Sequence, residues 1–178
     1  MRLFKTKLKG LLVIKQNEFK DNRGSLRVTH NQQINKIKNF CFEYCTTSKK
    51  NSLRGFHYQY KKPQAKYVNV LKGKILDCVI DLRKNSKTFG KIFKIVLSSR
   101  NKLSLFIPRG FGHAYFSYDK ENIVYYKLDN YYNPKYESGI NPLENNFKKI
   151  WPKKKFLISK KDKKLISFSQ FKKKNKFL

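Results

Sequence analysis

A long succession of short strand-like segments is the sequence feature that most constrains the fold. From Phe40 to Leu128, nearly every segment is rich in β-branched or aromatic residues and is bounded by Gly, Pro, Asn or Ser. Because no amphipathic helical pattern separates these segments, alternating β-α units are disfavoured. The pattern predicts an antiparallel sandwich or barrel, and a jelly roll fits it best.

The chain has 178 residues, a length at which we expect a single domain. Strands are predicted at residues 11–14, 25–29, 67–71, 75–82, 93–97, 103–107, 112–118 and 123–128. Residues 17–24 are predicted to form a polar turn, and Lys72-Gly73 the tight turn of a hairpin between 67–71 and 75–82. Short helices are expected at 31–37 and 160–166, an N-terminal arm at 1–30, and a frayed basic tail at about 168–178.

The net charge of +31, from 42 basic and 11 acidic residues, would by itself suggest a polyanionic partner. Only seven of the basic residues are arginine, however, and the many lysines accompany an excess of Asn, Ile and Phe. This composition indicates a bias that fills solvated faces with lysine. Since no nucleic-acid-binding motif accompanies the charge, we do not expect nucleic-acid binding. A basic β-barrel that binds nucleic acid or an acidic glycan remains the non-enzymatic alternative.

Cys41, Cys45 and Cys78 are odd in number and carry no metal-site spacing, which is typical of reduced cysteines in a cytoplasmic protein. No apolar stretch approaches the length of a membrane span, and no cleavage site follows the apolar run at 11–14. We therefore expect a cytoplasmic protein without a membrane partner.

The stretch LRGFHYQ, residues 53–59, concentrates the candidate chemistry. Strict strand alternation would place Arg54, Phe56 and Tyr58 on one face, and His57 and Gln59 on the other. His57 is one of three histidines, the side chains suited to proton transfer near neutral pH.

His113 also follows an Arg-Gly pair, Arg109-Gly110, as His57 follows Arg54-Gly55. This repetition predicts two strand corners that face one cavity. Asp77 and Asp81 share one face of the 75–82 strand, where they either orient a basic group or are solvated, and an ion pair with Arg83 is favoured for Asp81. The absence of HxH, CxxC and HxxxH patterns argues against a metal site, and the absence of GxSxG against a serine hydrolase.

Several ordered motifs together carry a family resemblance. They are FKDNRG (19–24), LRGFHYQ (53–59), QAKYV (64–68), DCVIDLRKNSKTFG (77–90), IPRGFGHAY (107–115), YYKLDNYYNPKYESGI (125–140) and ISKKD (158–162). With these motifs the chain resembles the dTDP-4-dehydrorhamnose 3,5-epimerase family. The resemblance implies an all-β, cupin-type double-stranded β-helix (jelly roll) with an exchanged N-terminal arm. It also implies a homodimer without metal or cofactor that epimerises a nucleotide-linked 4-keto-6-deoxy sugar.

The resemblance assigns four catalytic residues. His57 matches the base, Asp162 the carboxylate that orients it, Tyr126 the acid on the opposite sugar face, and Lys66 the group that stabilises the enolate oxygen. The remaining positions are implied to contact the nucleotide-diphosphate sugar. They are Phe19, Arg23, Arg54, Gln59, Asp77, His113, Tyr132, Glu137 and Lys161.

Among the substrate positions, Arg23, supplied by the partner's arm, and Arg54 are implied to bind the diphosphate, and Tyr132 to stack on the base. The chain departs from the family at Val28, at 44–46 (Tyr-Cys-Thr) and at 141–143 (Asn-Pro-Leu), which leaves the nucleotide base open. A C3-only epimerase or a 3,4-ketoisomerase acting on a different nucleotide sugar is the enzymatic alternative.

Overall fold

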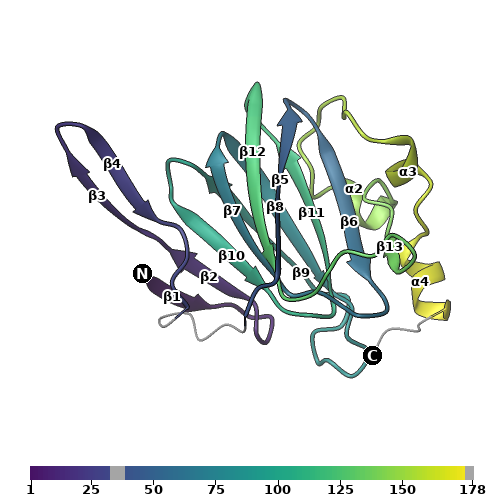
Figure 1. Cartoon of the computed structure of the whole chain (residues 1–178). Coiled ribbons are helices and arrows are strands. Elements are labelled where there is room, and N and C mark those ends of the chain that lie inside the picture. Colours follow the sequence, from purple (N-terminus) through teal and green to yellow (C-terminus); the bar gives the residue numbers. More distant parts are fainter. Residues whose placement is uncertain (33–38, 175–178) are drawn as a thin grey trace.

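The computed structural model describes residues 1–32 and 39–174, most of which form two antiparallel β-sheets packed face to face (Figure 1). The six-stranded sheet has the order β1 (Arg2–Lys5), β2 (Leu12–Lys15), β10 (Leu103–Ile107), β7 (Lys66–Lys72), β12 (Glu121–Leu128), β5 (Phe42–Lys49). The five-stranded sheet has the order β13 (Glu137–Gly139), β6 (Leu53–Gln59), β11 (Phe111–Ser117), β8 (Lys74–Asp81), β9 (Ile92–Ser98). This arrangement confirms the predicted all-β jelly roll.

The two larger apolar clusters of the described residues lie between the sheets and on the outer face of the five-stranded sheet, and a smaller one surrounds Ile14 and Tyr67. Strand β8 contributes to both larger clusters, because Ile75 and Val79 face the inner core while Leu76, Cys78 and Ile80 face the outer one. Every residue of this strand after Lys74 is buried, and burial on both faces explains why five of its eight residues are apolar.

The predicted hairpin across Lys72-Gly73 is wrong, because the chain changes sheets there. Strand β7 pairs with β10 and β12, whereas β8 pairs with β9 and β11. Gly73 has a φ of +84°, and a Cβ atom at this position would lie 2.6 Å from Asn122 Oδ1. Glycine is therefore required where the chain passes from one sheet to the other. In the sequence, a Lys-Gly pair at such a passage looks the same as a Lys-Gly pair in a hairpin turn.

Residues 17–24 do not form one polar turn, contrary to prediction. They include β3 (Asn17–Asp21), which pairs with β4 (Gly24–Val28) around a turn at Asn22-Arg23. The β3–β4 arm projects away from the two sheets (Figure 1). Because most of its side chains are exposed on both faces, the arm lacks the apolar alternation that identifies a strand in sequence.

In the described part of the chain, three short helices cover the outer face of the five-stranded sheet: α2 (Asn145–Lys148), α3 (Lys160–Lys163) and α4 (Phe168–Lys174) (Figure 1). Helix α3 is shorter than the predicted 160–166. Residues 168–174 are not frayed as expected, because Phe171 is buried against Tyr58 and Phe89. The helix predicted at 31–37 falls largely outside the described residues, and no described helix is long and apolar enough to cross a membrane.

Candidate active site

A β-bulge in β6 shapes the centre of the site. His57 is opposite His113 and Arg54 is opposite Tyr115, so Gly55 and Phe56 together face the single residue between the two partners. Gly55 has a φ of +103°, and a Cβ atom there would lie 2.7 Å from the Cα atom of the facing residue, Ala114. Only glycine fits this close approach of the two strands.

The bulge overturns part of the predicted alternation. Arg54 lies on the same inner side as His57, whereas Leu53 and Phe56 join Tyr58 in the outer core. Strict alternation correctly separated His57 from its neighbours but assigned Arg54 to the wrong face. The extra residue shifts the side-chain pattern by one position.

His57 is held by Asp162, which lies far away in the sequence. The His57 Nε2 atom is 2.7 Å from Asp162 Oδ1, and the Gly55 N–H donates to Asp162 Oδ2 at 3.1 Å. Burial would raise the pKa of Asp162, but the hydrogen bonds from His57 and Gly55 hold it below the ordinary value. The carboxylate is therefore charged at neutral pH and fixes the orientation of the imidazole ring.

The C-terminal segment is positioned so that Asp162 can reach β6. Leu157 pairs with Ser52 at the start of β6, and its carbonyl accepts from the Leu53 N–H at 2.9 Å. Ser159 then caps α3 by accepting from the Asp162 N–H at 3.0 Å. These contacts place the buried carboxylate beneath the bulge.

The second histidine and Tyr126 meet between the sheets. His113 Nε2 lies 2.8 Å from Asp77 Oδ2, and both side chains are buried. The Tyr126 ring, on β12 of the facing sheet, contacts the His113 ring edge-on at a centroid distance of 5.9 Å. Because His57 is the cross-strand neighbour of His113, the imidazole of His57 and the phenol of Tyr126 belong to opposite walls of one inter-sheet space.

Tyr126 is buried, which raises its pKa well above the ordinary value, and the neighbouring Tyr115, Tyr44 and Asp77 raise it further. The phenol is therefore protonated at neutral pH and can act as a proton donor. Tyr44, its cross-strand partner on β5, stacks on the Tyr126 ring at 4.8 Å with an interplanar angle of 21°.

Lys66, at the start of β7, is a buried cation on the wall formed by the six-stranded sheet. Burial lowers its pKa to about 8, and the negative charges of Glu137 and Asp77 limit this decrease. Asp77 Oδ1 is buried and has no hydrogen-bond partner among the described residues. A lysine with charged carboxylates nearby and little water can stabilise a developing oxyanion.

Glu137 on β13 contacts two other predicted site residues, Tyr132 and Lys161. Tyr132 Oη donates to Glu137 Oε2 at 2.7 Å, and Lys161 forms an ion pair with the same oxygen. Burial opposes the charge of Glu137, but these two donors keep its pKa below the ordinary value.

Gln59 lies deeper in the fold. Its side-chain amide binds the backbone of Lys62, Tyr131 and Asn133, so it holds the 129–136 loop in place and does not face open space.

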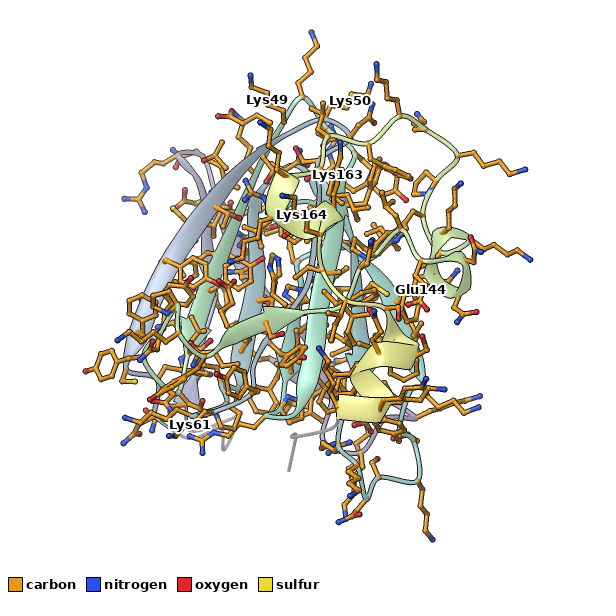
Figure 2. All side chains as sticks on the ribbon, turned by 90° about the vertical axis from the view of Figure 1, so that its right-hand side faces the viewer. Lys49, Lys50, Lys61, Glu144, Lys163 and Lys164 are labelled. Carbon is orange, nitrogen blue, oxygen red and sulfur yellow. The ribbon has the colours of Figure 1, made fainter. Side chains whose placement is uncertain are left out.

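A pocket of 620 Å³ opens beside His57 and is called here the reaction pocket. Among the predicted site residues it is lined by Arg54, His57, Lys161 and Asp162, and Lys49 extends its rim. Arg54 Nε donates to Ser48 Oγ at 3.0 Å, and Arg54 Nη2 donates to the Thr47 carbonyl at 3.1 Å. In Figure 2, Lys49 and Lys50 lie at the same upper end of the molecule as Lys163 and Lys164, which follow Asp162 along the chain.

Nine of the predicted site residues do not line the reaction pocket: Phe19, Arg23, Gln59, Lys66, Asp77, His113, Tyr126, Tyr132 and Glu137. Of these, Phe19 and Arg23 are on the projecting β3–β4 arm, where Phe19 is 60% exposed and Arg23 binds Asp21.

The predicted pairing of two Arg-Gly corners around one cavity is wrong for the second corner. His113 does join His57, but Arg109 binds Asp129 and lines a different pocket.

Sequence reasoning missed the roles of Tyr44, Tyr115 and Ser48. Tyr115 Oη lies 2.9 Å from both Thr46 Oγ1 and Ser48 Oγ, so it links the two sheets and supports the serine that binds Arg54. Tyr115 lies two residues after His113 on one strand, a spacing that signals a shared face. Tyr44 and Ser48 carried no comparable signal.

Comparison with known proteins agrees with this geometry. A sequence model described as dTDP-4-dehydrorhamnose 3,5-epimerase matches residues 5–170. The chain is 38% identical over 168 residues to the dTDP-4-dehydrorhamnose 3,5-epimerase of Methanothermobacter thermautotrophicus, which covers 90% of this chain and 91% of that protein. The crystal structure of the Elizabethkingia anophelis enzyme superimposes with a TM-score of 0.87 at 32% identity, covering 96% and 97% of the two chains.

A further solved structure is the Legionella pneumophila epimerase in complex with dTDP-4-keto-L-rhamnose. It has a TM-score of 0.89 at 29% identity and covers 94% of this chain and 93% of that chain. Sequence and fold thus agree over nearly the whole length, with a cupin-like jelly roll in common. This chain therefore belongs to the dTDP-4-dehydrorhamnose 3,5-epimerase family.

Proposed function

We propose that this protein epimerises a nucleotide-linked 4-keto-6-deoxy sugar by removing and returning a proton beside the C4 ketone. The observation that carries the proposal is the placement of His57, held by Asp162, and Tyr126 on opposite walls of one inter-sheet space. Inversion at carbon requires a base on one face of the sugar ring and an acid on the other. The function serves deoxysugar and surface polysaccharide biosynthesis.

In the proposed reaction, His57 takes the proton from C3, and the electron pair of the broken C–H bond forms an enolate with its negative charge on the C4 oxygen. Lys66 stabilises that oxygen through its charge in a site with little water. Tyr126 then donates its phenolic proton to the opposite face of C3, and the ketone forms again. Proton exchange with solvent then returns His57 to its neutral form and Tyr126 to its phenol, and the same sequence at C5 gives the double epimer. Because only protons move, we expect no metal or redox cofactor to be needed.

The nucleotide is proposed to bind along the reaction pocket. Arg54 is fixed by Ser48 and Thr47, and it remains accessible in the pocket, which suits contact with a diphosphate. Tyr132 is 47% exposed beside Glu137 and Lys161, where its ring can stack on a base. A Bacillus anthracis epimerase at 28% identity has been solved with TDP and PPi bound, which supports a nucleotide diphosphate in this chain.

We further propose a homodimer built through the β3–β4 arm. Phe19 and Leu26 are paired across the arm, and they are 60% and 63% exposed, an unfavourable arrangement for an isolated chain. Packing against a second copy would bury them and bring Arg23 from the arm's turn toward the other copy's pocket. If the proposal is correct, the wild type sediments as a dimer and the double variant Phe19→Ser, Leu26→Ser sediments as a monomer. A wild type that sediments as a monomer would refute it.

We also propose a cytoplasmic location, which the unpaired cysteines support.

Solvent deuterium exchange tests the reaction directly. Wild-type protein in D₂O should incorporate deuterium at C3 and C5 of dTDP-4-keto-6-deoxyglucose, detected by proton NMR and mass spectrometry. His57→Ala should abolish uptake, and Tyr126→Phe should block inversion. The Tyr125→Phe variant is the matched control, because Tyr125 lies on the other face of β12 and binds Glu43.

The pattern of labelling separates the alternatives. Uptake at C3 alone identifies a C3 epimerase, and relocation of the ketone identifies a 3,4-ketoisomerase. A panel of dTDP-, CDP- and GDP-linked 4-keto sugars settles the base that the departures at Val28 and Tyr44 leave open. Absence of exchange with every member of the panel would refute the proposed function.

A further inference from the structure

A second pocket, larger than the reaction pocket, lies at the other end of the sandwich. Its volume is 860 Å³, and five cationic side chains line it: Lys7, Lys9, Arg83, Lys87 and Arg109. We call it the basic pocket. Strand β6 begins at the reaction pocket and leads, at its far end, to Pro63 on the rim of the basic pocket. In Figure 2, Lys61, two residues before Pro63, lies at the lower end of the molecule, and Lys49, which lines the reaction pocket, lies at the upper end.

The two arginines of the basic pocket are held by buried carboxylates. Asp81 accepts from Arg83 Nε and Nη2 at 2.8 and 2.7 Å, and Asp129 accepts from Arg109 Nε at 2.9 Å. Asp81 is fully buried, and the Asp129 side chain is only 6% exposed. These carboxylates therefore lie behind the guanidinium groups rather than in the pocket.

The three lysines of the pocket are not neutralised. Lys7, Lys9 and Lys87 are exposed, and within residues 1–32 and 39–174 none of them forms an ion pair. Among the residues that the structure describes, no carboxylate lines the pocket. After the two arginine pairs are counted, the pocket keeps an excess of three positive charges that repel one another unless an anion enters.

The arginine side of the pocket is rigid. The Arg83 guanidinium lies 4.5 Å from the centroid of the Phe111 ring, and its side chain packs against Gly110 so closely that a Cβ atom there would collide with it. Ser86 Oγ and Thr88 Oγ1 each donate to Asp81 Oδ2 at 2.6 Å, which fixes the loop that carries Arg83. Such preorganisation lowers the cost of binding a ligand.

The composition of the basic pocket also limits what it can recognise. Two of the chain's seven arginines lie here, although lysine makes up most of the basic residues. No aromatic side chain of residues 1–32 or 39–174 lines the pocket, so this part of the chain offers no surface there on which a nucleobase could stack. We propose that the basic pocket binds a compact anion with two or more phosphate groups, separate from the sugar nucleotide of the reaction pocket.

Isothermal titration with pyrophosphate tests the proposal. Because the reaction pocket is also expected to bind a diphosphate, the titration uses an Arg54→Gln background. We expect one pyrophosphate per chain in this background. The triple substitution Lys7→Gln, Lys9→Gln, Lys87→Gln should weaken that binding by about tenfold or more, since each exposed cation contributes modestly and the contributions combine.

A second triple variant, Lys153→Gln, Lys154→Gln, Lys155→Gln, removes the same charge from exposed positions outside both pockets and should change the affinity less than about twofold. Protection from lysine acetylation, mapped by mass spectrometry on the wild-type protein, provides a measurement independent of any variant. Pyrophosphate should protect the three lysines of the basic pocket and leave residues 153–155 reactive.

Three results would overturn the proposal: no pyrophosphate binding in the Arg54→Gln background, equal losses in the two triple variants, or no protection of the pocket lysines. Stronger binding of a single-stranded oligonucleotide than of pyrophosphate, lost in the pocket variant alone, would also overturn it in favour of a nucleic-acid site. With Arg54 intact, the Lys7, Lys9, Lys87 triple variant should keep wild-type deuterium exchange into the sugar nucleotide, so a failure of this proposal is distinguishable from a failure of the proposed function.

Discussion

Replacement of Lys66 by methionine should stabilise the fold while it removes activity. Burial lowers the pKa of this lysine from 10.5 to about 8, despite the charges of Glu137 and Asp77. Since one pH unit corresponds to about 1.4 kcal/mol, keeping the charged form in the fold costs roughly 3 kcal/mol relative to an exposed lysine. Methionine has a similar length and no charge, so the free energy of unfolding at pH 7 should rise by up to about 3 kcal/mol.

The pH dependence of this gain identifies its cause. Between about pH 8 and pH 10.5 the unfolded chain keeps the Lys66 proton while the folded chain has lost it. The unfolded state then binds more protons, so raising the pH stabilises the wild type. The stability difference between Lys66→Met and the wild type should therefore be largest at pH 7 and shrink as the pH approaches 10.

Guanidinium denaturation at pH 7, 8.5 and 10 measures this difference, and deuterium exchange into the sugar nucleotide measures activity. The control is Lys94→Met at an exposed position of β9, which should change the free energy of unfolding by less than about 0.5 kcal/mol at every pH. If Lys66→Met is less stable than the wild type at pH 7, or if its difference does not vary with pH, the charged lysine is not held at a cost and the reasoning fails.

Two further substitutions test the parts of the site around β6. Asp162→Asn should lower the exchange rate about 10- to 100-fold, because a hydrogen bond to a charged group at the 2.7 Å contact with His57 is lost; an unchanged rate would show that the carboxylate does not support the base. Gly55→Ala should destabilise the protein by about 3 kcal/mol or more in thermal unfolding, because its Cβ would collide with the His113 carbonyl. Gly24→Ala has a positive φ but open space around it, so an equal loss in both variants would contradict the steric explanation.

Local sequence patterns predicted strands at the positions of β2, β4 and β7 to β12, but no separate strand at β1, β5 or β13. The alternation in β8 correctly assigned Asp77 and Asp81 to one face, and Asp81 forms the predicted ion pair with Arg83. Short apolar segments with glycine and proline at their ends also predicted the jelly roll without any knowledge of pairing. These features depend on the periodicity of apolar side chains, which can be read from the order of residues alone.

The exposed and the non-local features could not be predicted in this way. The sequence does not distinguish the passage between sheets at Gly73 from a hairpin turn. It also gives no alternating pattern for strand β3, because the β3–β4 arm buries little of either face. Likewise, Phe171 anchors a helix in a tail whose composition predicts fraying. At Gly73 and Phe171 the deciding contacts come from segments that are distant in sequence, and these contacts outweigh local propensity.

The sequence by itself determined which chemical groups the protein carries and which strands they lie on. Only the tertiary structure decided which of them meet. The bulge at Gly55 turned Arg54 toward His57, the C-terminal segment brought Asp162 beneath β6, and Arg109 was left at the opposite end of the molecule. The physical reason is that strand register and loop packing set distances between residues far apart in sequence, and neither is encoded in the spacing of a motif.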